Sequence, residues 1–207
     1  MVLRGRINNP VLFVCDLQEK FRTAIYGFDK CIQTTQKLLK ASQILQIPIL
    51  ATTQLSQKLG PLVPELQLPE RTKIFDKSLF SMMTPELIAH LDTAITAESK
   101  GVVVAVGQKK SVALVGIESH VCILQTCLDL LAAGHNVYVI ADAVSSCNRQ
   151  EVPIALGRMR RAGAVVTTSE SWLYEVMGDA KIEEFRQIAG LVKESKESTT
   201  LALQSLL

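Results

Sequence analysis

The sequence has little of the material from which metal sites, membrane spans and nucleic-acid surfaces are built. Its 207 residues include only three histidines (His90, His120 and His135), and no two of them are closely spaced. It contains no apolar run long enough to cross a bilayer. Its formal net charge is only +2, with lysines and arginines scattered along the chain. We therefore expect a globular protein with no nucleic-acid partner and no membrane partner.

The cysteines likewise lack a pattern that indicates disulfides or a structural zinc site. There are five of them, an odd number, and none forms a CxxC pair. This usage predicts reduced thiols and a cytoplasmic protein. Met1–Arg6 carries two arginines and no acidic residue, which leaves a mitochondrial association open. Strand-like residues begin by Val11, however, so the segment before them is too short for a cleavable presequence.

Strand-like and helix-like segments alternate along most of the chain. Six short runs that are apolar or β-branched predict strands: residues 11–15, 48–53, 73–75, 112–115, 137–140 and 164–168. Helical periodicity or helix-boundary residues predict helices near residues 28–45, 85–91, 119–133, 152–162, 170–177 and 182–192. This alternation predicts a single α/β domain, with a parallel sheet covered by helices on both faces.

Two segments do not fit the alternation. Residues 95–110 contain a run of β-branched residues bounded by Gly101 and Gly107, which suggests a projecting arm or an extra strand that contacts another subunit. Residues 194–207 are first polar and then apolar, so this tail docks on its own domain, docks on a neighbour or frays. We therefore predict a domain over residues 1–193, with an inserted arm, and a C-terminal tail.

Three reactive side chains lie just after predicted strands. Asp16 follows the first strand, Lys77 follows the third, and Cys122 lies in the first turn of the helix after the strand at 112–115. In open parallel sheets, ligands bind beyond the carboxyl ends of the strands. A thiol in the first turn of a helix faces free backbone N–H groups and the positive end of the helix dipole, which favours the thiolate. Cys122 is therefore a candidate nucleophile.

The three side chains together make chemical sense. Asp16 could accept a proton from the Cys122 thiol or from water, and the Lys77 ammonium would stabilise both negative charges. Backbone N–H groups around Ile117–Cys122 could hold an oxyanion, at about 3 kcal/mol for each donor. Taken singly, each residue also has a simpler explanation: a core thiol, a turn cap and a surface lysine. Because all three lie just past strand ends, the interpretation that they form one catalytic site is favoured.

The same residues carry a resemblance to a known family. Val14–Gln18, Lys77–Ser81 and Gly116–Cys122 resemble the three signature segments of the isochorismatase-like cysteine hydrolases. Among these, the chain most resembles the eukaryotic isochorismatase domain-containing proteins. The resemblance extends over about residues 8–192, with the three segments in the order that the family shows.

This resemblance implies a six-stranded parallel sheet in Rossmann-like order, the isochorismatase-like hydrolase fold. It implies a catalytic triad of Asp16, Lys77 and Cys122. It further implies a cis peptide bond just before the nucleophile's helix, between Ile117 and Glu118. The expected oxyanion hole then consists of the backbone at Ile117, Glu118 and Cys122.

The resemblance also bears on the pocket and the partners. It implies that Gln18 and Phe80 line the pocket mouth, and His120 lies close enough in sequence to the nucleophile to join them. Family members are usually dimers or tetramers, so we expect a homo-oligomer that acts on a small-molecule substrate. We expect no cofactor and no catalytic metal, because the chain lacks the closely spaced histidine pair of the metal-binding relatives.

The sequence thus predicts a cysteine hydrolase that cleaves a small, non-peptide amide or related carbonyl compound through a thioester. Two alternatives stay open. One is a nicotinamidase-type amidase, although nicotinamidases bind a metal through an aspartate and a histidine pair. The other is a non-catalytic interaction protein that retains a vestigial site. A nuclease has little support, since the sequence offers no histidine pair, no acidic metal cluster and no basic patch.

Overall fold

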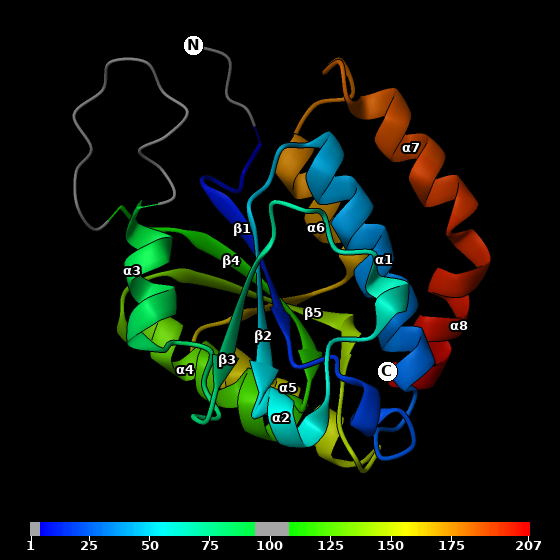
Figure 1. Cartoon of the computed structure of the whole chain (residues 1–207). Coiled ribbons are helices and arrows are strands. Elements are labelled where there is room, and N and C mark those ends of the chain that lie inside the picture. The colour runs from blue at the N-terminus through cyan, green and yellow to red at the C-terminus, as the bar shows by residue number, and fades with distance from the viewer. Residues whose placement is uncertain (1–4, 94–107) are drawn as a thin grey trace.

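A six-stranded sheet organises the computed structural model, which describes residues 5–93 and 108–207 (Figure 1). The strands are β1 (Pro10–Cys15), β2 (Ile49–Gln54), β3 (Lys73–Lys77), β4 (Ser111–Ile117), β5 (Asn136–Ser145) and β6 (Val165–Thr167). Every neighbouring pair is parallel, and the order is β3-β2-β1-β4-β5-β6. The chain therefore builds the sheet outward from β1 to β3 and then returns to place β4 beside β1. This confirms the predicted parallel sheet in Rossmann-like order.

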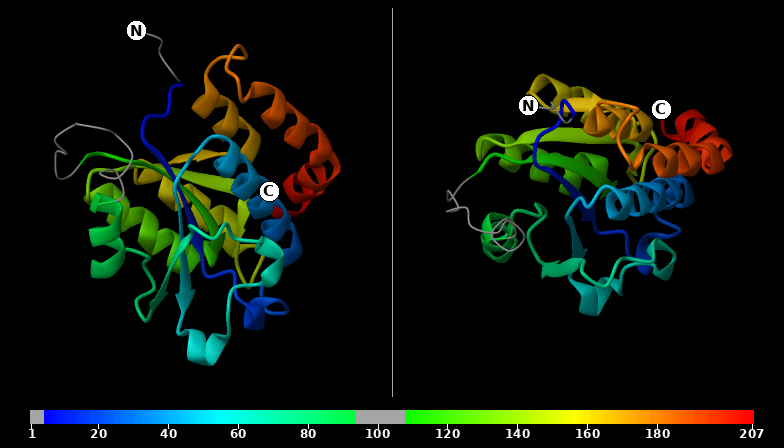
Figure 2. Two further views of the ribbon diagram at one scale, coloured as in Figure 1. Left: turned by 45° about the horizontal axis from the view of Figure 1, so that its top comes forward. Right: turned by 90° about the horizontal axis from the view of Figure 1, so that it is seen from above.

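Helices cover both faces of the sheet (Figures 1 and 2). One face is covered by α1 (Phe28–Ile44), α6 (Ser169–Met177) and α7 (Phe185–Glu194), and the other by α3 (Pro85–Thr93), α4 (Leu124–Ala132) and α5 (Glu151–Arg161). The short helices η1 (Glu19–Phe21), α2 (Ser56–Leu59) and η2 (Pro64–Leu66) lie in connections. Apolar runs such as β1 fit this arrangement because successive side chains point to opposite faces and both faces are buried. None of the described helices is both long and apolar enough to cross a membrane.

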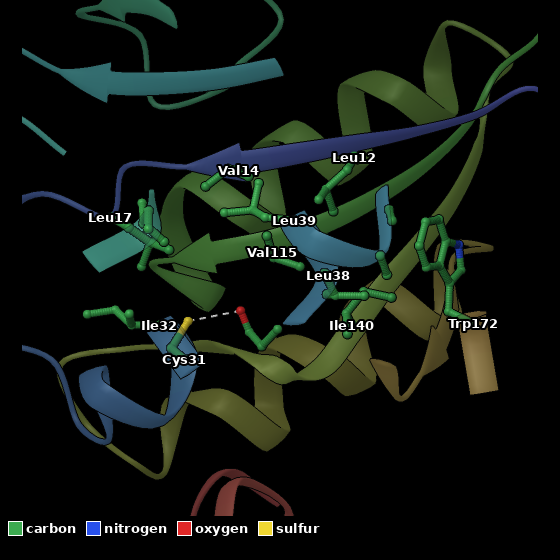
Figure 3. Close-up of a cluster of buried hydrophobic side chains, with 14 of the residues drawn as sticks. Leu12, Val14, Leu17, Cys31, Ile32, Leu38, Leu39, Val115, Ile140 and Trp172 are labelled. Carbon is green, nitrogen blue, oxygen red and sulfur yellow. Dashed lines mark hydrogen bonds between the residues drawn. The ribbon is translucent and has the colours of Figure 1, made fainter. Parts of the chain in front are cut away.

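The core on the α1 face shows how β1 and α1 hold each other in place. Leu12 and Val14 of β1 belong to the same buried cluster as Leu38 of α1 and Trp172 of α6 (Figure 3). The thiol of Cys31, also on α1, donates a hydrogen bond to the carbonyl oxygen of residue 143 in β5 at 2.9 Å. Burial raises the pKa of this thiol to about 12, so Cys31 is a packed core residue rather than a reactive one.

The C-terminal segment forms a helix that packs on its own domain. Helix α8 (Lys196–Leu206) lies against α1 and β5 (Figure 1). The ammonium of Lys37 on α1 donates to the hydroxyl of Thr199 at 2.8 Å, and both side chains are buried. Of the three outcomes left open for the tail, the structure shows the first. The expected arm at 95–110 falls mostly on residues 94–107, which lie outside the described residues.

Two strands run further than their apolar patterns predict. The pattern at residues 137–140 continues as β5 to Ser145, through the fully buried Asp142. The carboxylate of Asp142 accepts the backbone N–H of Ser169 at 2.7 Å, which allows a charged residue inside a core strand. Likewise, β3 continues through Asp76 to Lys77, because this strand lies at the end of the sheet, where alternate side chains face solvent. These extensions bring the strand ends to the functional site.

Candidate active site

The three reactive side chains predicted from the sequence lie at the carboxyl edge of the sheet. Asp16 follows β1, Lys77 is the last residue of β3, and Cys122 lies just after β4. Strands β1 and β4 are neighbours although β2 and β3 separate them in the chain, so the site lies where the direction of strand addition reverses. This is the usual ligand position in open parallel sheets. The fold therefore brings together what the sequence separates by about a hundred residues.

Asp16 and Lys77 form a buried ion pair. Nζ of Lys77 lies 2.7 Å from Oδ2 of Asp16, and the side chains are only 0% and 2% exposed, respectively. The second carboxylate oxygen of Asp16, Oδ1, accepts a hydrogen bond from the hydroxyl of Thr52 at 2.8 Å. Thr52 is the register partner of Cys15, the residue before Asp16, on the adjacent strand β2. Both oxygens of the carboxylate are therefore held in fixed positions.

The ammonium of Lys77 is held by further acceptors. It donates to Oε1 of Gln54 at 2.6 Å and to the carbonyl oxygens of Leu79 and Phe80 at 3.1 and 3.0 Å. Burial lowers the pKa of Lys77, but its interactions with Cys15, Asp16 and Cys122 outweigh this effect, so the net pKa is raised. Lys77 therefore stays charged and fixes the loop that follows β3.

Cys122 faces this ion pair from the start of the helix after β4. Its Sγ, the Sγ of Cys15 and a carboxylate oxygen of Asp16 all lie within 4.8 Å of one another. Cys122 is 8% exposed, so the thiol is almost closed off from solvent. It belongs to a π-helical turn, Ser119–Ile123, that leads into α4. Thr126 on α4 donates its hydroxyl to the carbonyl oxygen of Cys122 at 2.6 Å and so anchors the turn.

A second thiol, Cys15, lies beside the same carboxylate. Its Sγ donates to Oδ2 of Asp16 at 3.5 Å, and the residue has no exposed surface. Burial raises the pKa of Cys15 well above its usual value, and a hydrogen bond with Cys122 and the charge of Asp16 raise it further. Cys15 is therefore held as a neutral thiol. Sequence reasoning did not single it out because it ends an apolar strand and has no distinguishing neighbour.

Gly116 allows β1 and β4 to approach each other at the site. It has a φ of +115°, and a Cβ added there would lie 2.1 Å from the carbonyl oxygen of Cys15. No side chain fits at that distance, so only glycine is compatible with this backbone arrangement. The peptide bond between Ile117 and Glu118, which follows, is cis. The carbonyl oxygen of Glu118 then accepts the backbone N–H groups of Val121 and Ile123, which starts the turn.

The three residues expected at the pocket occupy different positions. Gln18 is fully buried, and its side-chain amide is used by the backbone of Gln54 and Gly60, so it braces two loops rather than offering a free group at a mouth. Phe80 is 53% exposed, on the loop that Lys77 holds. His120 is partly exposed, and its Nδ1 lies 2.9 Å from the hydroxyl of Ser146.

Three residues of the site were not predicted: Cys15, Thr52 and Gln54. Cys15 and Gln54 are the last residues of β1 and β2, and Thr52 lies two residues before the end of β2. Thr52 is the register partner of Cys15, and Gln54 is the register partner of Lys77. The strand order, once known, would have identified them. A separate cavity of about 570 Å³, lined by Pro48, Ile49 and residues of neighbouring elements, lies at the amino end of β2. It is on the opposite edge of the sheet from Asp16, Lys77 and Cys122.

Comparisons with known proteins agree with this fold. The Isochorismatase domain family model matches residues 10–171. Human isochorismatase domain-containing protein 2 is 40% identical over 192 residues, covering 92% of this chain and 87% of the human protein. A structure described as MAR1 ribonuclease from Caenorhabditis elegans is 39% identical, with a TM-score of 0.78 and 92% coverage of both chains. The YcaC gene product of Escherichia coli, described as an octameric hydrolase of unknown specificity, is 22% identical with a TM-score of 0.78, and covers 99% of this chain and 97% of its own.

Proposed function

Since this chain belongs to the isochorismatase family, we propose that it is a cysteine hydrolase that cleaves a small, non-peptide amide or related carbonyl compound through a thioester. The observation that carries the proposal is the buried Asp16–Lys77 ion pair with the thiol of Cys122 beside it. A carboxylate held by a cation and placed next to a thiol at a helix start is the arrangement needed for an activated nucleophile.

In the first half of the reaction, Cys122 is acylated. Asp16 takes the thiol proton, and Sγ of Cys122 attacks the carbonyl carbon of the substrate. Backbone N–H groups at Ile117, Glu118 and Cys122 hold the resulting oxyanion. When the C–N bond breaks, Asp16 returns the proton to the departing amine, so the amine leaves neutral. The acyl group stays on sulfur as a thioester.

In the second half, water releases the acyl group. Asp16, again a carboxylate, takes a proton from a water molecule. The oxygen of that water attacks the carbonyl carbon of the thioester. The S–C bond breaks, the carboxylic acid leaves, and the proton returns to the thiol. Lys77 keeps its charge through both halves, since its pKa is raised, and it compensates the negative charge on Asp16 and Cys122. Phe80 and Leu79, both more than half exposed, are available to contact the acyl group.

The test uses a library of small amides that includes nicotinamide, with released amine and intact protein mass as readouts. We expect amine release by the wild-type protein and an acyl adduct on Cys122. Cys122→Ala should lower turnover by about 10³-fold or more without unfolding the protein. Cys147→Ser, at the exposed cysteine, is the matched control and should keep full activity. Full activity of Cys122→Ala would refute the mechanism, and nicotinamide as the best substrate would favour the nicotinamidase alternative.

The non-catalytic alternative is tested by thiol alkylation. A functional site should label Cys122 well before the other buried thiols, because Cys122 is 8% exposed whereas Cys15, Cys31 and Cys127 have no exposed surface. The experiment is done in the Cys147→Ser background, since that exposed thiol would otherwise dominate the signal. Equal labelling of all the remaining cysteines would favour a protein that works by binding alone.

Cleavage of RNA is the second candidate function, because the Caenorhabditis elegans relative is described as a ribonuclease. In this chain, Lys77 is 4% exposed and already bonded to four acceptors, so it offers no free charge to a phosphate. Single-stranded RNA incubated with the wild-type protein and with Cys122→Ala separates the two functions. RNA cleavage that survives in Cys122→Ala, without amide turnover by the wild type, would replace our proposal.

We also propose that the chain is a homo-oligomer. Support comes from the relative described as octameric and from exposed apolar side chains such as Ile154, at 67% exposure, and Val165, at 46%. Light scattering coupled to size exclusion should give a mass at least twice that of the chain. A monomeric mass at micromolar concentration would contradict this.

A further inference from the structure

A second cluster of reactive side chains lies beside the start of the nucleophile's helix. It consists of Glu118, His120 and Cys147, which each place one metal-binding atom within 4.8 Å of the other two. Glu118 directly precedes the π-helical turn that carries Cys122, His120 lies within that turn, and Cys147 follows the end of β5. The proposed reaction uses none of these three side chains for its chemistry. The cluster therefore needs its own explanation.

Local hydrogen bonds already orient two of these side chains. The backbone N–H of Cys147 donates to Oε2 of Glu118 at 3.0 Å, so the carboxylate is held over the cysteine. Nδ1 of His120 lies 3.8 Å from the same oxygen and 2.9 Å from the hydroxyl of Ser146. The side chains of His120 and Glu118 are 28% and 23% exposed, and Cys147 is exposed. An ion could thus enter from solvent.

We propose that Glu118, His120 and Cys147 bind a zinc ion. A thiolate, an imidazole and a carboxylate are the three side-chain types that zinc prefers, and three protein ligands leave the fourth tetrahedral position to water. Ligand atoms around tetrahedral zinc are separated by about 3.3–3.6 Å, given zinc–ligand distances of about 2.0–2.3 Å. Here the three atoms lie within 4.8 Å of one another, and Nδ1 of His120 is 3.8 Å from Oε2 of Glu118, so side-chain rotations that close these gaps would let all three contact one ion.

The other cluster of this kind, at the triad, is a poorer cation site. Cys15, Asp16 and Cys122 also lie within 4.8 Å of one another, but the Lys77 ammonium lies 2.7 Å from the carboxylate. A fixed positive charge at that distance repels a divalent cation. Among the described residues, no lysine or arginine forms a hydrogen bond or ion pair with the side chains of the outer cluster. The two clusters can be distinguished because each depends on a different cysteine.

A zinc ion at the outer cluster would link the nucleophile's turn to the loop after β5. That link goes beyond the proposed hydrolysis and does not depend on it, since the ligands and the readout are independent of any substrate. Binding would also release the thiol proton of Cys147, because zinc binds cysteine as the thiolate. Proton release therefore reports on whether the thiol is a ligand.

The experiment titrates zinc chloride alone into the reduced, chelator-washed full chain by calorimetry in two buffers of different ionisation enthalpy. Four proteins are compared: wild type, Cys147→Ser, Cys122→Ser and the charge control Glu151→Gln. We expect one zinc ion per wild-type chain with proton release. Cys147→Ser should weaken binding by about 100-fold or more, since a lost ligand costs at least as much as a lost outer-shell contact. Cys122→Ser and Glu151→Gln should bind as the wild type does.

Cobalt provides a second readout that does not depend on affinity. Cobalt bound by the wild type and by Cys122→Ser should show the near-ultraviolet charge-transfer band of a thiolate–metal bond, and Cys147→Ser should lack it. Binding that is lost in Cys122→Ser and kept in Cys147→Ser would place the ion at the triad and overturn the proposal. Wild-type protein that binds no zinc at micromolar concentration would overturn it as well. Amide turnover that fails while zinc binds would count against the proposed hydrolysis only.

Discussion

Replacing Lys77 by methionine is the most direct test of the charge arrangement at the site. The substitution keeps an unbranched side chain, one atom shorter than lysine, and removes its charge. It leaves Asp16, which is 1% exposed, as a buried carboxylate without its cation. It also leaves the carbonyl oxygens of Leu79 and Phe80 without their common donor.

The expected loss of stability follows from burial. Breaking a buried pair by removing one partner costs about 3–5 kcal/mol, because the remaining charge is uncompensated. Whole domains are stable by only about 5–15 kcal/mol, so Lys77→Met should remove a large fraction of the free energy of unfolding. The double variant Asp16→Asn/Lys77→Met should be more stable than the sum of the single effects predicts, because it leaves no buried charge.

The assay is urea unfolding of the single and double variants, followed by circular dichroism. The matched control is the surface pair formed by Arg22 and Glu65, which has the same 2.7 Å separation but side chains that are 36% and 45% exposed. Arg22→Met should leave the unfolding midpoint within experimental error, because solvent screens such a pair. Arg22 also pairs with the exposed Glu19 at 2.6 Å, so each substitution removes a cation with more than one partner, and the two cases differ in the burial of those partners.

The reasoning would be refuted by a small effect. If Lys77→Met costs less than about 1 kcal/mol, the range of exposed pairs, then Asp16 is not a buried charge that depends on Lys77. The proposed role of Asp16 as the proton carrier would then lose its physical basis, whatever the effect of the substitution on turnover.

Three further predictions concern the same region and the core. Gly116→Ala should lower the free energy of unfolding by about 3 kcal/mol or more in thermal melts, since the added Cβ would lie 2.1 Å from a backbone oxygen. Gly134→Ala, with a φ of +82° and no atom within 4 Å, should lower it by only about 1–2 kcal/mol through backbone strain, and equal losses would argue against the close strand contact. Burial raises the pKa of Cys31 and Cys127 to about 12, so neither thiol should be alkylated in the folded protein at about pH 8, and both should be alkylated in urea; rapid native labelling would contradict their burial. The pKa of Lys77 is raised above its ordinary value of 10.5, so its stabilising effect should be complete below about pH 10.5 and decline as the pH rises through the folded-state pKa, with melts of Lys77→Met lacking that alkaline loss.

Much of the fold was predictable because the central strands are apolar runs that end at polar residues. Where a strand carries buried polar groups, the pattern fails. Asp142 interrupts the apolar run of β5, and only the contact with Ser169, distant in sequence, reveals why the strand continues. The helical structure of α8 was not predicted for a similar reason: its apolar side chains are buried by contacts with α1 and β5, which are distant in sequence.

The candidate site was predictable in part. Asp16, Lys77 and Cys122 could be selected because carboxyl ends of parallel strands meet at one edge. Cys15 could not, since its proximity to Cys122 depends on the register between β1 and β4, which sets Cys15 opposite Gly116. For Gln18, the sequence suggested a pocket residue but could not show its hydrogen bonds. Its type and position suit a pocket, yet three hydrogen bonds to the backbone of Gln54 and Gly60 use its amide for bracing.

The position of β3 at the end of the sheet has a kinetic consequence for the site. β1 is hydrogen-bonded to neighbours on both sides, whereas β3 pairs only with β2 among the described residues. Local opening of β3 therefore breaks fewer hydrogen bonds than opening of β1. When thermal fluctuations separate β3, Lys77 leaves while Asp16 and Cys122 stay in the sheet and its adjoining helix. Amide exchange should accordingly be faster in β3 than in β1, and heat should inactivate the protein before its tertiary structure melts.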